Sequence, residues 1–265
     1  MYNIFTMRRV FILPIFLALV GAGCADRWDR LISANYYLTP ELHEQSRAEV
    51  EQTLVKLAEQ IGISTKIFEE RKRSLDIRMG YPELQAGGST SSRETFNKAM
   101  KAYIDGTVDQ FKKDFEAAGS ASDAGDWLLS SDYRVPYTSP SLVSVVIDGS
   151  MYQGGAHPNS FYQTFIYLVQ KERFVSAEEV FSEASDLLAA SDAAQKELAA
   201  RDISDAEWIQ NGAGPSMENY RHVYITDAGL AVIFPPYQVA AYAAGPQEVI
   251  IPWSVIPGTR HVLFR

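Results

Sequence analysis

The longest periodic stretch of this sequence is SSRETFNKAMKAYIDGTVDQFKKDF, residues 91–115. Its apolar side chains recur at helical spacing and share one face: Phe96, Met100, Ile104, Val108, Phe111 and Phe115. Ser91 and Glu94 have the spacing of a capping box, in which the two side chains satisfy free backbone N–H groups where a helix begins. The pattern therefore predicts an amphipathic helix that begins near Ser91 and packs through one face.

Strand patterns lie on both sides of this helix. Alternating or continuous apolar residues predict strands at 75–81, 127–137, 142–147 and 161–169. Pro82 is expected to end the first strand, because proline cannot donate a ladder hydrogen bond. Residues 87–90 read as a loop, and Asp148-Gly149 is typical of a two-residue hairpin turn. The middle of the chain is therefore expected to be rich in hairpins.

Helix and strand signals also alternate toward both ends of the chain. Ser176 and Glu179 form a second capping box, which is expected to open an Ala-rich helix that runs to about Ala200. Residues 211–216 read as a loop, and short strands are expected at 222–226, 230–234, 249–252 and 262–264. A third helix is expected from Thr39, with Gly62 as its stop. The fold class predicted is α+β, with mostly antiparallel sheets and two to three long helices packed on them.

The N-terminus has the layout of an export signal. Arg8 and Arg9 precede an apolar run from Val10 to Val20, and small residues lead from it to Cys24, the only cysteine in the chain. This ending resembles the lipobox of bacterial lipoproteins, which implies cleavage before Cys24 and acylation, for example by palmitate, of that cysteine. Ala25 is not the aspartate that retains some lipoproteins in the inner membrane, so the expected location is the periplasmic face of the outer membrane. The alternative is an ordinary signal peptide with an incidental cysteine.

Domain organisation and charge follow from that reading. We expect a signal peptide at 1–23, a lipid-anchored tether at 24–38, an N-terminal α+β subdomain at 39–148 and a C-terminal one at 149–265. Loss of Arg8 and Arg9 with the signal changes the formal charge from −9 to −11. An acidic protein repels nucleic acid and attracts a cationic partner. The plainer interpretation is that many soluble envelope proteins are acidic.

A search for catalytic motifs finds none that is complete. His43, His157, His222 and His261 lack the spacing of metal ligands, and neither a G-x-S-x-G elbow nor a phosphate-binding loop occurs. With Cys24 assigned to the lipid, we expect no catalytic residue, no metal, no cofactor and no enzymatic activity. Acidic residues are plentiful, so a carboxylate pair assembled by the fold remains open, and with it an uncharacterised hydrolase.

One loop stands out between two strand-like stretches. It contains six candidate positions for a binding or structural role: Tyr152, Gly154, Gly155, His157, Pro158 and Asn159. The two glycines permit positive φ angles, and the proline stiffens the exit of the loop. His157 is expected either to contact a ligand or to bond a backbone carbonyl within a turn.

A second segment carries a family resemblance. Its residues fit D-x-G-L from Asp227, then Phe234, Tyr237, Tyr242 and Gly245, followed by an Ile-Pro strand. Together with the G-G-A-H-P-N loop, it resembles the RsiV-type extracytoplasmic domain. That family includes the lysozyme-sensing part of RsiV anti-sigma factors and the region before the catalytic domain of PdaC-type peptidoglycan deacetylases. The resemblance covers about residues 64–257 and makes Tyr237, Tyr242 and Gly245 candidate site positions.

The resemblance implies a binding function. RsiV proteins carry a sigma-binding segment and a membrane helix before the domain, and the deacetylases carry a catalytic domain after it, whereas this sequence begins with a cleavable signal and ends at Arg265. We therefore expect a non-catalytic periplasmic module that binds or inhibits a cationic muralytic protein of the lysozyme type. The alternative is peptidoglycan docking through exposed aromatic residues such as Tyr133, Tyr137, Tyr162 and Trp253, for which core packing is the plainer interpretation.

Overall fold

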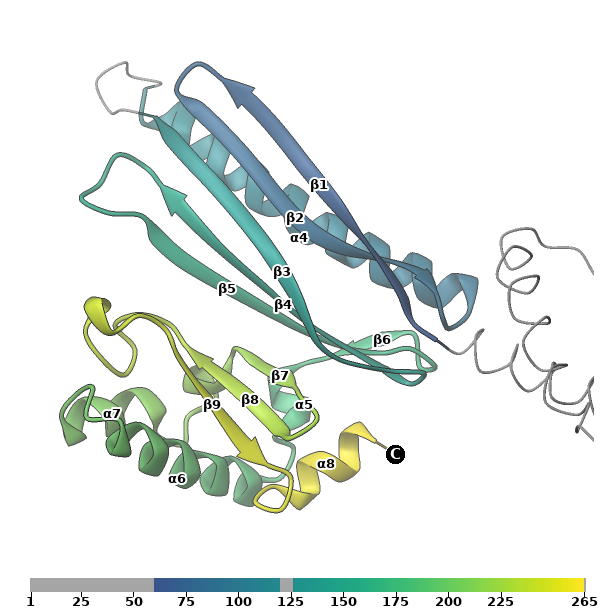
Figure 1. Ribbon diagram of the computed structural model, residues 1–265, viewed down its shortest axis with the longest axis vertical. Coiled ribbons are helices and arrows are strands. Elements are labelled where there is room, and N and C mark those ends of the chain that lie inside the picture. Colours follow the sequence, from purple (N-terminus) through teal and green to yellow (C-terminus); the bar gives the residue numbers. More distant parts are fainter. Residues whose placement is uncertain (1–59, 120–125, 265) are drawn as a thin grey trace, which may run out of the picture. The chain divides into compact units, whose positions relative to one another are not determined.

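The computed structural model describes residues 60–119 and 126–264 (Figure 1). The expected signal peptide, Cys24, the tether and the body of the helix from Thr39 lie outside these residues. The strands, labelled as in Figure 1, are β1 Gly62–Lys72, β2 Leu75–Ala86, β3 Trp127–Ser139, β4 Leu142–Tyr152, β5 Asn159–Leu168, β6 Arg173–Val175, β7 Val223–Ile225, β8 Gly229–Phe234 and β9 Gln247–Pro252. The helices are α4 Thr90–Ala117, α5 Ala177–Val180, α6 Ala184–Ala200, α7 Ala206–Ala213, α8 Pro257–Leu263 and the short η3 Met217–Tyr220 and η4 Tyr242–Ala244. Within the described ranges, no helix is both long and apolar enough to cross a membrane.

Two sheets make up the fold. The first has six strands in the order β1-β2-β3-β4-β5-β6, and the second has three in the order β7-β8-β9. All neighbouring strands are antiparallel except β2 and β3, which are parallel because α4 carries the chain back between them. The expected α+β class, with mostly antiparallel sheets and long helices packed on them, is confirmed.

Helix α4 packs on one face of the large sheet through the predicted apolar stripe (Figure 1). Phe96, Met100, Ile104, Val108 and Phe111 are buried, and Phe115 is partly buried against the same core. The helix begins two residues earlier than predicted, because Ser89 is the N-cap and its hydroxyl accepts a hydrogen bond from the backbone N–H of Ser92 at 2.9 Å. The Ser91 hydroxyl instead donates to the carboxylate of Glu172 at 2.7 Å.

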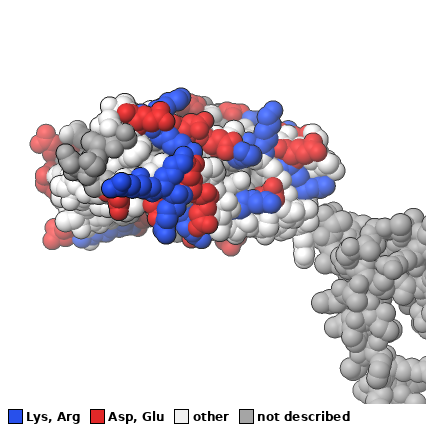
Figure 2. All heavy atoms as spheres, turned by 90° about the horizontal axis from the view of Figure 1, so that it is seen from above, with Lys and Arg blue, Asp and Glu red and all other residues white. Residues whose placement is uncertain are grey.

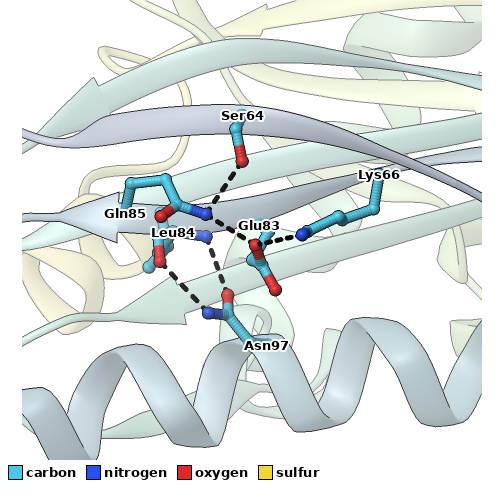
Figure 3. A network of polar contacts seen from close by, with 6 residues as sticks. All are labelled: Ser64, Lys66, Glu83, Leu84, Gln85 and Asn97. Carbon is cyan, nitrogen blue, oxygen red and sulfur yellow. Dashed lines mark hydrogen bonds and ion pairs between the residues drawn. The ribbon is translucent and has the colours of Figure 1, made fainter.

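A side-chain amide of α4 fixes the helix against β2 (Figure 3). The Asn97 Oδ1 accepts from the backbone N–H of Leu84 at 2.7 Å, and its Nδ2 donates to the carbonyl of the same residue at 3.1 Å. Pairing between β2 and β3 ends at Met79, so Leu84 has no strand partner on that side. Asn97 therefore supplies the two hydrogen bonds that a continued β3 would have made.

The same departure of β3 explains why Pro82 does not end β2. Pro82 lies within the strand, opposite Thr65 of β1. Because Pro82 is two residues from Leu84, its nitrogen faces the same unpaired side, where no donor is needed. Strand β1 itself, where the sequence predicted only the end of a helix at Gly62, is an edge strand of largely exposed residues. Its charged side chains weaken the alternation on which the prediction relied.

Asp148 and Gly149 do not form the predicted hairpin turn. Both lie inside β4, opposite Tyr162 and Phe161 of β5. A Cβ on Gly149 would come within 2.2 Å of the Phe161 ring and 2.6 Å of the Ser130 carbonyl oxygen. The glycine therefore permits close packing in the sheet rather than a turn. The subdomain boundary expected at residue 148 falls within β4, and the change from one sheet to the other comes after Val175.

The second sheet has helices packed against it and shares a core with the large sheet through Leu142 of β4 and Ile166 and Leu168 of β5. Buried side chains from α6, α7 and all three strands share one cluster, which includes Leu198, Ile209, Ile225, Val232 and Ile251. The capping box of Ser176 and Glu179 is confirmed, but it opens only the short α5, and the Ala-rich α6 begins separately at Ala184.

Two other expectations for the C-terminal part are wrong. Part of the loop expected at 211–216 belongs to α7, which ends at Ala213. The strand expected at 262–264 is replaced by α8, which begins with Pro257 in its first turn. Proline is favoured there because its fixed φ suits a helix and the N–H it lacks would be unpaired anyway.

The two sheets touch along β4 and β7. Val146 of the large sheet forms a small buried cluster with Tyr224, Ala231 and Ile233 of the other. The Ser144 hydroxyl, fully buried, accepts a hydrogen bond from the backbone N–H of Ile225 at 2.8 Å. This contact brings the strands β3 to β5 and the strands β8 and β9 to face each other.

Candidate functional site

The loop singled out in the sequence is the hairpin turn between β4 and β5. Gly154 has a φ of +85°, as predicted, but Gly155 is not among the positive-φ residues of the described chain. A Cβ on Gly155 would be 3.9 Å from the nearest non-neighbouring atom, the His157 carbonyl oxygen. The left-handed backbone is thus confined to Gly154, where glycine adopts it without strain. His157 bonds a backbone carbonyl, as one of its two interpretations proposed: its Nδ1 donates to the Pro158 oxygen at 2.9 Å.

The second motif forms the turn after β8. Tyr237 has a φ of +71°, and Gly245, which ends η4, has a φ of +68°. A left-handed backbone is unusual for a bulky residue and costs about 1–3 kcal/mol. Two hydrogen bonds hold Tyr237 in it: its N–H donates to the Ala240 carbonyl at 3.1 Å, and its own carbonyl accepts from Trp208 Nε1 at 3.1 Å. The tyrosine side chain is 58% exposed.

The structure brings these two motifs together. The Tyr242 hydroxyl donates to the Pro158 carbonyl, 84 residues away in the sequence, at 2.8 Å. The Tyr242 ring stacks on His157, with centroids 4.2 Å apart and planes 27° apart, and the Tyr237 ring lies 5.5 Å from Tyr242. We call His157, Tyr242 and Tyr237 the aromatic platform. Its outer members, His157 and Tyr237, are exposed.

Next to the platform, a groove of about 850 Å³ lies between the two sheets. It is lined by Arg78, Ser130, Ser131, Asp132, Arg134, Asp148, Gly149, Ser150, Ser160, Tyr162, Ile233, Pro246 and Glu248. Ser160 follows Pro158 by two residues, and Pro246 directly follows Gly245. The platform therefore stands where the β4–β5 hairpin and the turn containing η4 meet the groove.

The polar groups of the groove form two rows across the large sheet. One row contains Arg78, Ser130, Ser150 and Ser160, which are opposite one another on β2, β3, β4 and β5. The next row contains Asp132, Asp148 and Tyr162. Directly opposite residues share a face of the sheet, so both rows point the same way, away from α4. Of these residues, only Tyr162 was among the candidates named from the sequence. The signal for the others was a polar residue at every second position of each strand.

Arg134 joins the two walls of the groove. Its guanidinium donates to the Tyr224 hydroxyl at 2.9 Å, lies 4.6 Å from the centre of that ring, and forms an ion pair with Glu248 of β9. Cation–π and charge-assisted contacts of this kind reinforce one another in a partly buried site. Arg134 is therefore committed to the protein and is not free to hold a ligand.

Asp148 is in a different situation. Burial raises the pKa of Asp148, and the nearby Asp132 and Glu248 carboxylates raise that pKa further, while Arg134 opposes them. Among the described residues, no hydrogen bond reaches its carboxyl group. Ser130, Ser150, Ser160 and Asp148 thus offer donors and acceptors to a ligand. The described chain contains no group of three or more His, Cys, Asp or Glu residues placed to hold a metal.

The aromatic residues expected to dock a glycan are mostly packed against other residues. The hydroxyl groups of Tyr133 and Thr65 are hydrogen-bonded at 2.8 Å, and Tyr137 and Trp253 pack against Phe264 at 6.0 and 5.4 Å between ring centroids. Tyr162 alone of the four lines the groove. The aromatic platform instead uses residues from the two sequence motifs. The exposed aromatic surface is therefore the platform and not the four residues named from composition.

Two family profiles match the chain. Residues 68–160 match the family described as deacetylase PdaC, and residues 178–254 match a protein family of unknown function, DUF3298. The chain is thus similar to PdaC-type domains in the first region and to DUF3298 domains in the second. The first contains His157 and the second contains Tyr237 and Tyr242, so the platform joins the two matched regions.

Similar proteins are found in several bacteria. The chain is 30% identical over 166 residues to the peptidoglycan-N-acetylmuramic acid deacetylase PdaC of Bacillus subtilis, a match that covers 62% of this chain but only 36% of that protein. It is 24% identical over 188 residues to the immunogenic protein MPT64 of Mycobacterium tuberculosis, covering 69% of this chain and 81% of that one. A crystal structure of a DUF3298 family member from Bacteroides fragilis shares the fold, with a TM-score of 0.57 at 13% identity, over 78% of this chain and 99% of that chain.

Proposed function

We propose that this chain, as part of a PdaC-like extracytoplasmic family, is a non-catalytic binding module for a component of the bacterial cell wall. The observation that carries the proposal is the meeting of the two matched regions at one exposed surface. The platform and the groove next to it are built from both, and they combine exposed aromatic rings with polar groups that the described protein does not fully use. A concave surface with a few convergent polar groups is the usual form of a binding site.

The wall itself is suggested as the ligand by the relative whose name includes its substrate, peptidoglycan. That relative is a deacetylase, but the chain spans only 36% of its length, and the sequence lacks a recognisable catalytic motif. The proposal concerns the binding role of the residues described and leaves the relative's deacetylase activity with that relative. Release of acetate from peptidoglycan by the purified protein would contradict it and favour the hydrolase alternative.

Co-sedimentation with insoluble peptidoglycan tests the binding role. The exported protein, purified in detergent, should sediment with the wall, and Tyr242→Ala should reduce the bound fraction at least about fivefold, as loss of one interface anchor would. Leu188→Ala is the matched control, because Leu188 is 52% exposed on α6, outside the platform and groove. Equal sedimentation of all three proteins would show that the site is elsewhere.

A lysozyme-type protein is the second candidate ligand. The resemblance to a lysozyme-sensing domain and the formal charge of −11 after loss of the signal favour it. Figure 2 shows acidic and basic side chains interspersed on the face it presents, rather than a single negative field. The net charge of −11 nevertheless attracts a cationic protein at long range, so the association rate constant with lysozyme should fall between low and high salt. Tight binding of lysozyme, with no retention on peptidoglycan, would show that a lysozyme-type protein is the ligand and the cell wall is not.

Anchoring to the envelope by lipid on Cys24 is part of the proposal. It is supported by the basic, apolar and small-residue segments before that cysteine. The exported protein should partition into the detergent phase, and Cys24→Ser should leave the precursor uncut or release the protein into the aqueous phase. Wild-type protein that stays fully in the aqueous phase would contradict lipid anchoring, and fractionation of the membranes would then test the outer-membrane location.

A further inference from the structure

We infer that the groove and the platform bind the saccharide part of the wall, with one pyranose ring stacked on Tyr242 and Tyr237 and the next ring held by Ser150, Ser160 and Asp148. This inference rests on the proposed function and names the ligand class for the same site. It goes further, because peptidoglycan contains both glycan strands and peptides, and the two make different demands on a binding surface.

The platform fits the face of a sugar. A pyranose ring presents a flat face of C–H groups surrounded by hydroxyls, so it can stack on an aromatic ring while its rim stays hydrogen-bonded. Tyr242 is supported from behind by His157 at 4.2 Å and by the hydrogen bond to Pro158, so its ring is held in place before a ligand arrives. Preorganised aromatic residues lose little entropy on binding.

Tyr237 adds an independent sign that this surface is used. Its left-handed backbone is strained, and relief of that strain by glycine would be simple, yet a tyrosine with a 58% exposed side chain occupies the position. The Tyr237 side chain contributes little to the hydrophobic core, so core packing does not explain why a tyrosine is kept in a strained backbone conformation. Strained residues of this kind cluster at binding sites, where the surrounding structure holds them.

The groove fits the rim of a sugar. Ser130, Ser150 and Ser160 form a row of hydroxyls that both donate and accept, and Asp148 adds a carboxyl acceptor next to them. The groove contains two arginines and three carboxylates, and Arg134 is already paired with Glu248. A nearly balanced set of charges disfavours a strongly cationic or anionic ligand and suits a neutral one rich in hydroxyl and amide groups.

Titration calorimetry with a soluble oligomer of N-acetylglucosamine, six sugars long, tests the inference. The exported protein should bind the oligomer, and Tyr237→Gly should weaken binding at least about tenfold while raising the melting temperature. Ser74→Gly is the matched control, because Ser74 has a φ of +65° in the β1–β2 turn, outside the groove. It should raise the melting temperature in the same way and leave binding unchanged.

A second variant tests the groove. Asp148→Asn keeps the shape of the side chain and should weaken oligomer binding about tenfold, as loss of one charge-assisted hydrogen bond would. Asp105→Asn, on the exposed side of α4 and paired with Lys101, is the control and should bind normally. Unchanged binding by both Asp148→Asn and Tyr237→Gly would overturn the inference.

The outcomes separate this inference from the proposed function. Retention on peptidoglycan that needs Tyr242, together with no binding of the oligomer, would overturn the saccharide assignment and leave the wall-binding function standing with a peptide as ligand. No retention on peptidoglycan and no oligomer binding would overturn both. Binding of lysozyme at the platform, competed by neither glycan, would also overturn both and favour a protein ligand.

Discussion

The two faces of the large sheet use the same strands for opposite purposes. On β3, Trp127 and Leu129 point into the core under α4, whereas Ser130 and Asp132 on the other face line the groove. The same alternation divides β4, where Val145 and Ile147 are buried and Asp148 and Ser150 are in the groove. The helix-covered face supplies stability along its whole length. The opposite face is divided: Leu142, Ser144 and Val146 are buried toward the second sheet, whereas Asp148 and Ser150 are free to supply binding, because alternate residues of a strand point to opposite faces of the sheet.

The largest expected effect comes from the helix-covered face. Phe96→Ala should lower the free energy of unfolding by about 3–5 kcal/mol, because Phe96 is fully buried and packs on Tyr167 and Phe174. Ser130→Ala, on the groove face, should change it by less than about 0.5 kcal/mol. Chemical denaturation measures the free energy of unfolding of both variants. Similar losses of stability would mean that Ser130 also belongs to a structural core.

Gly149 tests how tightly β4 and its neighbours pack on the helix-covered face, where Phe161 lies. Gly149→Val should destabilise by about 1–3 kcal/mol, because its side chain would collide with Phe161 and with the backbone of Ser130. Gly155→Ala, in the open hairpin turn, should be close to neutral. Thermal melts of the two variants compare them directly, and a neutral Gly149→Val would show that β3 and β5 can move apart.

Tyr237→Gly should give a smaller effect of the opposite sign. It relieves the left-handed strain but adds freedom to the unfolded chain, so the net gain should be about 1 kcal/mol or less. A rise in melting temperature with weaker ligand binding would show stability given up for function. A fall in melting temperature would mean that the exposed ring packs usefully in the native state.

The smallest effect concerns pH. Because the pKa of Asp148 is raised in the folded protein, the stability linked to this group is present at acidic pH and is lost as pH rises through the folded pKa. Asp148→Asn should therefore raise the melting temperature at pH 7, and the difference should vanish near about pH 3, below the ordinary aspartate pKa. A lower melting temperature for Asp148→Asn at pH 7 would mean that attraction to Arg134 outweighs burial and the repulsion from Asp132 and Glu248.

Local patterns predicted the elements that have strong periodicity. The apolar face of α4, the strands β2 to β5 and the capping box at Ser176 are all readable in short windows of sequence. The errors occur where a neighbouring strand or side chain decides whether a residue lies in a strand or in a turn. Pro82 lies inside β2 because β3 no longer pairs with that side of the strand. Gly149 lies inside β4, where the Phe161 ring occupies the space that a Cβ would need.

The candidate site was predicted in parts. The hairpin loop with His157 and the turn with Tyr237, Tyr242 and Gly245 were both recognised, but as separate motifs. The His157 and Tyr242 rings stack because two turns from different sheets meet. Neither the periodicity of apolar residues nor the spacing of a motif reveals such a contact. Apart from Tyr162, the groove residues were missed, because serine and aspartate at alternating positions look the same on a solvated face as on the wall of a groove.

The sequence by itself determined which side chains share a face, where helices and strands alternate, and which two loops have unusual composition. The tertiary structure decided what those faces meet: α4 on one side of the large sheet, and β8 and β9 across a groove on the other. It also placed Tyr242 on His157, across 84 residues. The physical reason is that periodicity arises from backbone geometry within an element, whereas a site depends on distances between elements, which the packing of the two sheets sets.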